Sequence, residues 1–207
     1  MQGELEAYFA TLGALGGRIL ATDRAGASLT SAEAITRFVA ECERVKRDQA
    51  RVFFIGNGGS AAIASHMAID WMKNGGFAAS AFNDSALLTC LSNDLGYEQV
   101  FALPLRRHAS RGDLLIAISS SGQSANILAG VEVARNNGVT VVTLSGFSPD
   151  NPLFRCGDLN FYVPNNLYGF VEISHLTLCH AVLDIVMGWR ASGRDPVYSE
   201  NATERTA

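Results

Sequence analysis

The segment Val52-Phe53-Phe54-Ile55-Gly56-Asn57-Gly58-Gly59-Ser60 decides the fold. Its four apolar residues show no polar alternation, which is typical of a parallel strand buried on both faces. Three glycines within four positions then allow a sharp turn and a close approach of the backbone to a ligand. Ser60 is a candidate N-cap for an alanine-rich helix that Gly75 and Gly76 can end. This arrangement predicts an anion site, because free N–H groups and the helix dipole point to one place. The alternative is a tight turn without a ligand, which rarely needs three glycines.

The composition is that of an ordinary globular protein, with 48% hydrophobic and 17% charged residues among 207. We expect residues 1–192 to form one domain and residues 193–207 a polar, disordered tail. A net charge of −4 and the lack of a Lys/Arg run argue against a nucleic-acid partner. The acidic start and the lack of a stretch near the ~20 apolar residues of a span predict neither a signal peptide nor a membrane protein. Four scattered cysteines indicate reduced thiols in a cytoplasmic protein.

Strand and helix patterns alternate from Arg51 onward. After the first strand, further strands are expected at 79–82, 113–118, 139–144 and 159–163, and helices at 60–74, 86–109, 124–137, 151–155 and 169–190. This alternation predicts an α/β three-layer sandwich with a five-stranded parallel, flavodoxin-like sheet. Two amphipathic helices precede it. The first spans 4–21, and the second begins at a capping box formed by Thr30 and Glu33. We expect these helices to pack beside the sheet or against another subunit.

A second anion-suited loop, Ser119-Ser120-Ser121-Gly122-Gln123-Ser124, follows the third strand. It gathers hydroxyls and free N–H groups at the start of the next helix. In an open α/β sheet, ligands bind beyond the carboxyl ends of the strands at the switch point, which the first and third strands flank. A serine-rich loop can also be merely solvated. Two such loops at one edge of the sheet predict phosphate binding.

The first turn also matches the dinucleotide fingerprint, as Gly56-x-Gly58-x-x-Ala61, with Asp84 in a place for a ribose-binding acid. A lone fingerprint is weak, and it leaves the serine loop unexplained, so we expect no nucleotide cofactor. A Walker A loop is excluded because no Gly-Lys-Ser/Thr sequence follows the glycines.

Histidines and carboxylates gather on two of the expected helices. His66 and Asp70 share one helix face, and Glu172, His175 and His180 lie on the final helix. An imidazole beside a carboxylate suits both proton transfer and divalent metal binding. A surface hydrogen bond for the first pair and core positions for the last two histidines are the alternatives. Because Glu172 and His180 are about 12 Å apart along an ideal helix, one metal would need stretched side chains, a bulge or a second subunit to reach both.

Residues 51–189 resemble the sugar isomerase (SIS) domain and, within that family, the phosphoheptose isomerases, which interconvert sedoheptulose 7-phosphate and a heptose 7-phosphate. The resemblance is carried by the stretches 56–60 (GNGGS), 92–101 (SNDLGYEQVF), 112–124 (GDLLIAISSSGQS) and 163–164 (VP). It implies a parallel sheet between helices and a homotetramer with active sites near the subunit interfaces.

The resemblance also implies roles for individual residues. Phosphate and substrate contacts fall on the two loops and on one acid, namely Asn57, Gly58, Ser60, Ser119, Ser120, Ser121, Ser124 and Asp94. Zinc or another divalent metal is implied on His66, Asp70, Glu172 and His180. Asp70 would act as general base and His180 would move the proton between the two oxygens of a cis-enediol, with Glu172 as a third catalytic residue.

The chain departs from the family pattern at four positions, which leaves the particular sugar open. Asp70 replaces a glutamate, Glu172 a frequent glutamine, Gly169 an aspartate found in some members, and Asn74 an arginine of the lipopolysaccharide enzymes. We expect a phosphosugar aldose–ketose isomerase, with sedoheptulose 7-phosphate as the first candidate substrate. The alternative is a non-catalytic SIS regulator that binds a sugar phosphate. Such proteins tend to lose the histidine and carboxylate set, which this chain keeps.

Overall fold

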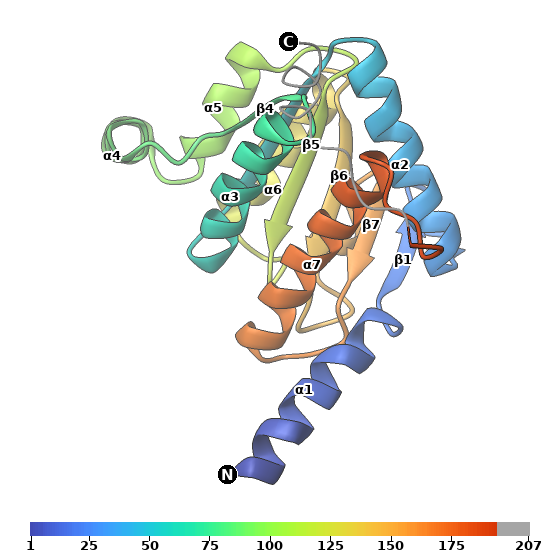
Figure 1. The fold of residues 1–207 in the computed structure, drawn as a ribbon. Helices are drawn as coiled ribbons and strands as arrows, with labels where there is room; N and C mark the ends of the chain where they lie inside the picture. The colour runs from blue at the N-terminus through green and yellow to red at the C-terminus, as the bar shows by residue number, and fades with distance from the viewer. Residues whose placement is uncertain (194–207) are drawn as a thin grey trace, which may run out of the picture.

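The computed structural model describes residues 1–193 and shows a seven-stranded sheet between two layers of helices (Figure 1). The strands are β1 Leu20–Asp23, β2 Ser28–Leu29, β3 Arg51–Gly56, β4 Ala78–Ala81, β5 Leu114–Ser119, β6 Thr140–Ser145 and β7 Leu159–Tyr162. The helices are α1 Gln2–Gly16, α2 Ser31–Arg47, α3 Gly59–Lys73, α4 Ser85–Leu95, α5 Gln99–His108, α6 Ala125–Asn136 and α7 Tyr168–Val186, with a short 3₁₀ helix, η1, at Pro152–Arg155.

Five strands form the predicted parallel core. Their order across the sheet is β4-β3-β5-β6-β7, which is the flavodoxin-like order expected from the sequence. The register pairs Gly56 with Ile118 and Ser119 with Ser145, so that β3, β5 and β6 end at the same edge. The glycine turn and the serine loop therefore lie next to each other.

An antiparallel hairpin extends the sheet from five strands to seven, which corrects the predicted strand number. β1 pairs with β7 and β2 pairs with β1, so the hairpin covers the edge strand of the parallel core. The helix predicted over 4–21 ends at Gly16, and Ile19 lies beyond it. The hairpin thus separates the two N-terminal helices. Its strands of four and two residues are too short to show an alternating pattern.

The structure corrects the start of one predicted helix and divides another. Gly58, with a φ of +54°, is the N-cap of α3, and Ser60 lies in the first turn rather than at the cap. The helix predicted over 86–109 is divided into α4 and α5 at Gly96, whose φ is +91°. Asp84 caps α4, because its Oδ1 accepts hydrogen bonds of 3.0 Å from two backbone N–H groups. Capping the helix accounts for an acid at this position without a nucleotide. The capping box at Thr30 is confirmed.

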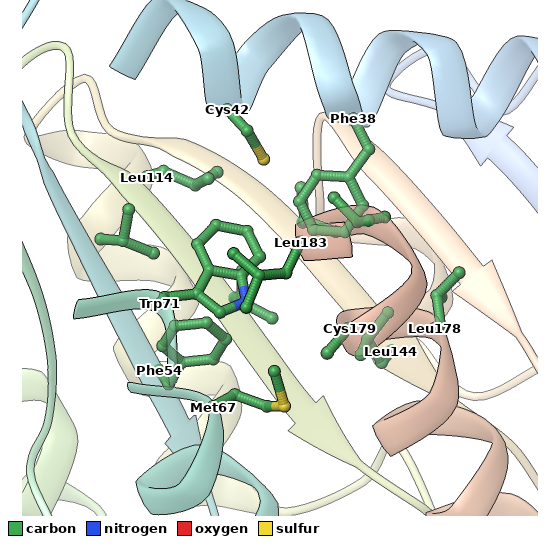
Figure 2. Packing of buried hydrophobic residues seen from close by; sticks show 14 of the residues in the cluster. Phe38, Cys42, Phe54, Met67, Trp71, Leu114, Leu144, Leu178, Cys179 and Leu183 are labelled. Carbon is green, nitrogen blue, oxygen red and sulfur yellow. The ribbon is translucent and has the colours of Figure 1, made fainter. Parts of the chain in front are cut away.

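The strand side chains alternate between the two helix layers. Val52 and Phe54 of β3 face α2, α3 and α7, while Phe53 and Ile55 face α5 and α6. Figure 2 shows the first of these layers, where Phe38 and Cys42, Met67 and Trp71, and Leu178, Cys179 and Leu183 surround strand residues that include Phe54, Leu114 and Leu144. This burial packs α3 beside α7.

Helix α7 is, by length and composition alone, long and apolar enough to cross a membrane, with a mean hydropathy of 1.4 over the best window. The sequence pattern predicted no such segment. In the fold, however, residues such as Val171, Cys179 and Val182 are buried against the sheet and its neighbouring helices. A helix that packs into a sheet needs the same apolar composition.

Helix α1 extends away from the rest of the chain (Figure 1). Leu15 is its one buried residue, whereas Leu5 and Phe9 are 58% and 61% exposed. Tyr8 stacks on Phe170 at the start of α7, with ring centroids 4.3 Å apart. The apolar stripe predicted for this helix therefore has little to cover it within one chain. The predicted domain end at residue 192 stays a prediction, since residues 194–207 lie outside the described part.

Candidate active site

A cavity of about 240 Å³ lies where β3 and β5 end, between the first turns of α3 and α6. It is lined by Asn57, Gly58, Gly59, Ser60, Ser119, Ser120, Ser121, Ser124, Tyr168 and Glu172. The structure thus brings together every residue of the glycine turn and the serine loop that the sequence indicated as phosphate-binding. The shared strand edge causes this convergence, because both loops leave the sheet at the same level.

Two helix N-termini face this cavity without a side-chain cap of their own within residues 1–193. Neither Gly58 before α3 nor Ser124 before α6 caps its helix through a side chain. The Ser124 hydroxyl instead lies 3.2 Å from the Ser119 hydroxyl. The Ser120 hydroxyl is buried, and within the described residues no partner accounts for it. Backbone N–H groups without a cap and the unpartnered Ser120 hydroxyl can donate hydrogen bonds to an anion, and the two helix dipoles add partial positive charge.

Glu172 brings a carboxylate to the same cavity. Its oxygens lie against Gly59, and a methyl group at position 59 would overlap them. A carboxylate at the first turn of α3 is favoured by the helix dipole. Gly59 is therefore needed for the placement of Glu172 as well as for the turn.

A second group of polar side chains lies farther along α3 and α7. The Nε2 atoms of His66 and His180 are 3.3 Å apart, the Oδ2 atom of Asp70 is 3.5 Å from His66 Nε2, and His180 Nδ1 is 3.8 Å from the same oxygen. One ligand atom from each residue lies within 4.8 Å of the others, so these three residues could hold a metal ion. Their side chains are 53%, 20% and 36% exposed for His66, Asp70 and His180 respectively, so solvent reaches them.

The structure does not place Glu172 with this group. Glu172 lines the cavity beside Gly59, whereas His180 lies eight residues later on the same helix, or about 12 Å along its axis. Three of the four residues indicated as metal ligands are thus together, and the fourth faces the cavity. The two turns of α7 between Glu172 and His180 account for this separation.

His175 is a buried histidine of the core, which is one of the two alternatives left open by the sequence. Its ring is fully buried, and its Nε2 atom is 3.0 Å from the backbone oxygen of Ser145. Burial lowers the pKa of His175 from 6.5 to about 4, so the ring is neutral and donates its proton to that oxygen. The bond ties α7 to the end of β6. His180, by contrast, is partly exposed.

Asp94 does not line the cavity. It is exposed on α4, where it accepts a 2.8 Å hydrogen bond from Asn93. None of the residues of α4, all of which are described, is buried, and the helix lies away from the sheet (Figure 1). The motif that indicated Asp94, residues 92–101, runs from the end of α4 through the turn at Gly96 into α5, where Val100 and Phe101 are buried.

Two residues of the site region had not been singled out from the sequence. Tyr168, the first residue of α7, lines the cavity, and Asn126, the second residue of α6, holds Asn57 through its side chain. An aromatic residue at the start of the last expected helix and an amide directly after the serine loop were the available signals.

Comparisons with known proteins give consistent matches. The family model described as SIS domain matches residues 22–146. A phosphoheptose isomerase from a Roseiflexus species is 37% identical over 157 residues, covering 72% of this chain and 79% of the relative. One from Mycobacterium tuberculosis is 39% identical over 146 residues, covering 68% and 74%. The structure of a phosphoheptose isomerase from Neisseria gonorrhoeae is 27% identical, has a TM-score of 0.75 and covers 89% of this chain and 97% of that chain.

The buried His175 predicts a specific pH dependence of stability. Its folded pKa of about 4 lies below its ordinary value of 6.5. The neutral ring therefore contributes stability that is fully present above pH 6.5 and is lost as the pH falls toward 4, about 3 kcal/mol in all. Urea unfolding of the wild type and of His175→Gln across this range should show this loss in the wild type alone. His108→Gln, at an exposed histidine, is the control and should keep the wild-type slope. Equal slopes in all three proteins would contradict the assignment.

Proposed function

The chain belongs to the SIS domain family, and because its relatives include phosphoheptose isomerases, we propose that it is a phosphosugar aldose–ketose isomerase acting on sedoheptulose 7-phosphate. One observation in the structure supports the proposal independently of the relatives. The same two helices, α3 and α7, present an anion cavity at one level and the His66, Asp70 and His180 group at another.

The cavity supplies the phosphate site. Hydroxyls of the serine loop and N–H groups at the starts of α3 and α6 surround the space. Its described lining contains no Lys or Arg, so hydrogen bonds and helix dipoles meet the phosphate charge. Each hydrogen bond to a charged group contributes about 1.5–3 kcal/mol. Tyr168 and Glu172 close the side of the cavity toward α7.

The spacing along α3 suits a long sugar. Ser60 lines the cavity, and His66 follows six residues later, or about 9 Å along the helix axis. A phosphate at one level and a carbonyl at the other must therefore be separated by several carbon atoms. An open-chain ketose with its phosphate at the end far from the carbonyl fits this spacing, and sedoheptulose 7-phosphate is such a molecule.

Asp70 and His180 carry the proton transfers in this proposal. The Asp70 carboxylate removes the proton from the carbon next to the carbonyl, and His180 moves a proton between the two oxygens of the cis-enediol. The imidazoles at 3.5 and 3.8 Å orient that carboxylate. Glu172, which faces the cavity, accepts hydrogen bonds from sugar hydroxyls between the phosphate and the reacting carbons.

The donor set of His66, Asp70 and His180 fits a divalent metal such as zinc. The separations of 3.3 Å between the two Nε2 atoms and 3.5 Å between His66 Nε2 and Asp70 Oδ2 match the edge of a tetrahedron with bonds of about 2.0–2.1 Å, which is about 3.4 Å. An ion held by these three residues would have room for a further ligand, as catalytic zinc sites do. When bound there, such an ion would polarise the carbonyl oxygen of the sugar.

A non-catalytic sugar-phosphate-binding regulator is the second candidate. The cavity alone would serve such a protein. A protein that only binds a phosphate has no need of the group formed by His66, Asp70 and His180. Polar atoms of these three side chains lie 3.3–3.8 Å apart, where solvent reaches them. This group favours the isomerase.

We also propose a homotetramer in the cytoplasm, with active sites near the subunit interfaces. Leu5 and Phe9 expose an apolar stripe on α1, and α4 has no buried residue although all of it is described. A neighbouring subunit that covers these helices would also lie close to Asp94 on α4. The four cysteines are free thiols, which supports a reducing compartment.

Proton exchange tests the isomerase. Because the carboxylic acid formed on Asp70 exchanges its proton with solvent, sedoheptulose 7-phosphate in heavy water should gain deuterium at the carbon that bears the new hydroxyl. Asp70→Asn keeps the shape but accepts no proton, so exchange and turnover should fall about 10²- to 10⁴-fold while binding changes little. NMR and calorimetry measure the two effects. Asp84→Asn, at the cap of α4, is the control for loss of a carboxylate. A wild type that binds phosphosugars and exchanges none of them would establish the regulator instead.

Metal analysis tests the donor set independently of turnover. Protein purified without chelator should contain about one zinc or similar ion per chain, because the three ligands are preassembled on two packed helices. His66→Ala and His180→Ala should lose it, while His108→Ala should keep it. Metal-free wild-type protein with full activity would limit these residues to acid–base and orienting roles.

Light scattering tests the assembly. The wild type should have four times the 22.1 kDa mass of the chain at micromolar concentration. Phe9→Glu places a charge in the exposed stripe and should shift the equilibrium toward smaller species. Ala14→Glu, which is exposed on the other side of α1 from Leu5, should leave the mass unchanged. A monomeric wild type would contradict the tetramer.

A further inference from the structure

A reciprocal pair of amides joins the two loops of the cavity. Asn57 Nδ2 donates to Asn126 Oδ1, and Asn126 Nδ2 donates to Asn57 Oδ1, both at 2.8 Å. Asn57 lies in the glycine turn before α3, and Asn126 is the second residue of α6. The two side chains therefore connect the helix N-termini between which the anion cavity lies.

The pair has two further partners. The Tyr97 hydroxyl, from the turn between α4 and α5, donates to Asn57 Oδ1 at 3.1 Å, and the backbone N–H of Ile127 donates to Asn126 Oδ1 at 3.0 Å. Asn126 is only 3% exposed. The Asn57 oxygen thus accepts two hydrogen bonds from within the chain. With both lone pairs engaged, this oxygen does not accept a hydrogen bond from a ligand, whereas one amide hydrogen of Asn57 remains.

The geometry gives this network a function that differs from phosphate contact. A part-buried, reciprocally satisfied amide pair fixes the distance between the atoms that it joins, because any shift breaks two hydrogen bonds at once. The N–H groups at the starts of α3 and α6 must both lie within hydrogen-bond distance of one phosphate. Small displacements of groups that hold a substrate weaken binding and catalysis strongly.

We propose that Asn126 and Tyr97 are positioning residues, which act through Asn57 to set the spacing of the two helix N-termini at the phosphate cavity. The identity of the sugar phosphate in this inference rests on the proposed function. The spacing of the two helix N-termini, however, affects the binding of any phosphate that enters the cavity. Tyr97 additionally links the cavity to the turn that follows α4.

Calorimetry with inorganic phosphate and with sedoheptulose 7-phosphate tests the pair. Asn57→Ala and Asn126→Ala should each weaken binding of both compounds about tenfold. The double variant should bind no more weakly than the weaker single variant, because both changes remove the same pair. Thr143→Ala is the matched control. It removes a buried 2.8 Å hydrogen bond to Asn160 away from the cavity, so it should lower the melting temperature and leave phosphate affinity unchanged.

Tyr97→Phe provides a test that does not disturb a buried residue, because Tyr97 is 49% exposed. It should raise the KM for sedoheptulose 7-phosphate about threefold with kcat unchanged within twofold. Tyr162→Phe removes a hydroxyl that donates to Phe147 O at the same 3.1 Å and should change neither constant.

The outcomes separate this inference from the proposed function. Failure of the folded wild type to bind either phosphate compound would overturn the proposed function and this inference with it. Wild-type binding together with wild-type affinity in Asn126→Ala and Tyr97→Phe would overturn the inference alone. Fully additive losses in the double variant would show that Asn126 does not act through Asn57, which also contradicts it.

Discussion

The site depends on the parallel register of β3 and β5. Because Gly56 is level with Ile118, the chain leaves both strands at one edge and enters α3 and α6 side by side. Each helix then begins with uncapped backbone donors directed at a common space. Displacing one strand by a residue would turn its buried side chains to the opposite face. The apolar contacts on both faces of β3 therefore hold the anion cavity in place, although they lie far below it.

The packing of α3 against α7 divides the site into two levels. Residues around Trp71, Leu178 and Leu183 bury the facing sides of the helices, so their first turns and their later turns form separate polar regions. The first turns hold Ser60 and Glu172 at the cavity, and the later turns bring Asp70 to the histidines. Rigid helices maintain this separation better than loops would, which suits a reaction whose substrate is held at one end and changed at the other.

Much of this arrangement follows from local sequence patterns, and the exceptions have physical causes. Uninterrupted apolar runs such as residues 52–55 predict buried parallel strands, and their alternation with helices gives the strand order. The strand β1 escapes such reasoning because it has only four residues and because its partner in the sheet core, β7, lies more than a hundred residues away. Glu172 illustrates another limit. Its place beside Gly59 results from how α7 lies along α3, which residue spacing on one helix does not determine. Asp94 lies on α4, which packs beside α5 through the partly buried Leu88 and Leu91, and it does not line the cavity.

Tyr8 of α1 contacts the first turn of α7, where its ring stacks on Phe170. Gly169 leaves the space that the Tyr8 hydroxyl occupies, and a Cβ atom at that position would approach this oxygen to 2.7 Å. The same turn of α7 carries Tyr168 and Glu172 into the cavity. If the exposed stripe of α1 is buried between subunits, assembly and substrate binding act on one structural element, and each changes the free energy of the other. Specific activity would then vary with enzyme concentration, and any residue with a Cβ atom at position 169 would require the Tyr8 side chain to move.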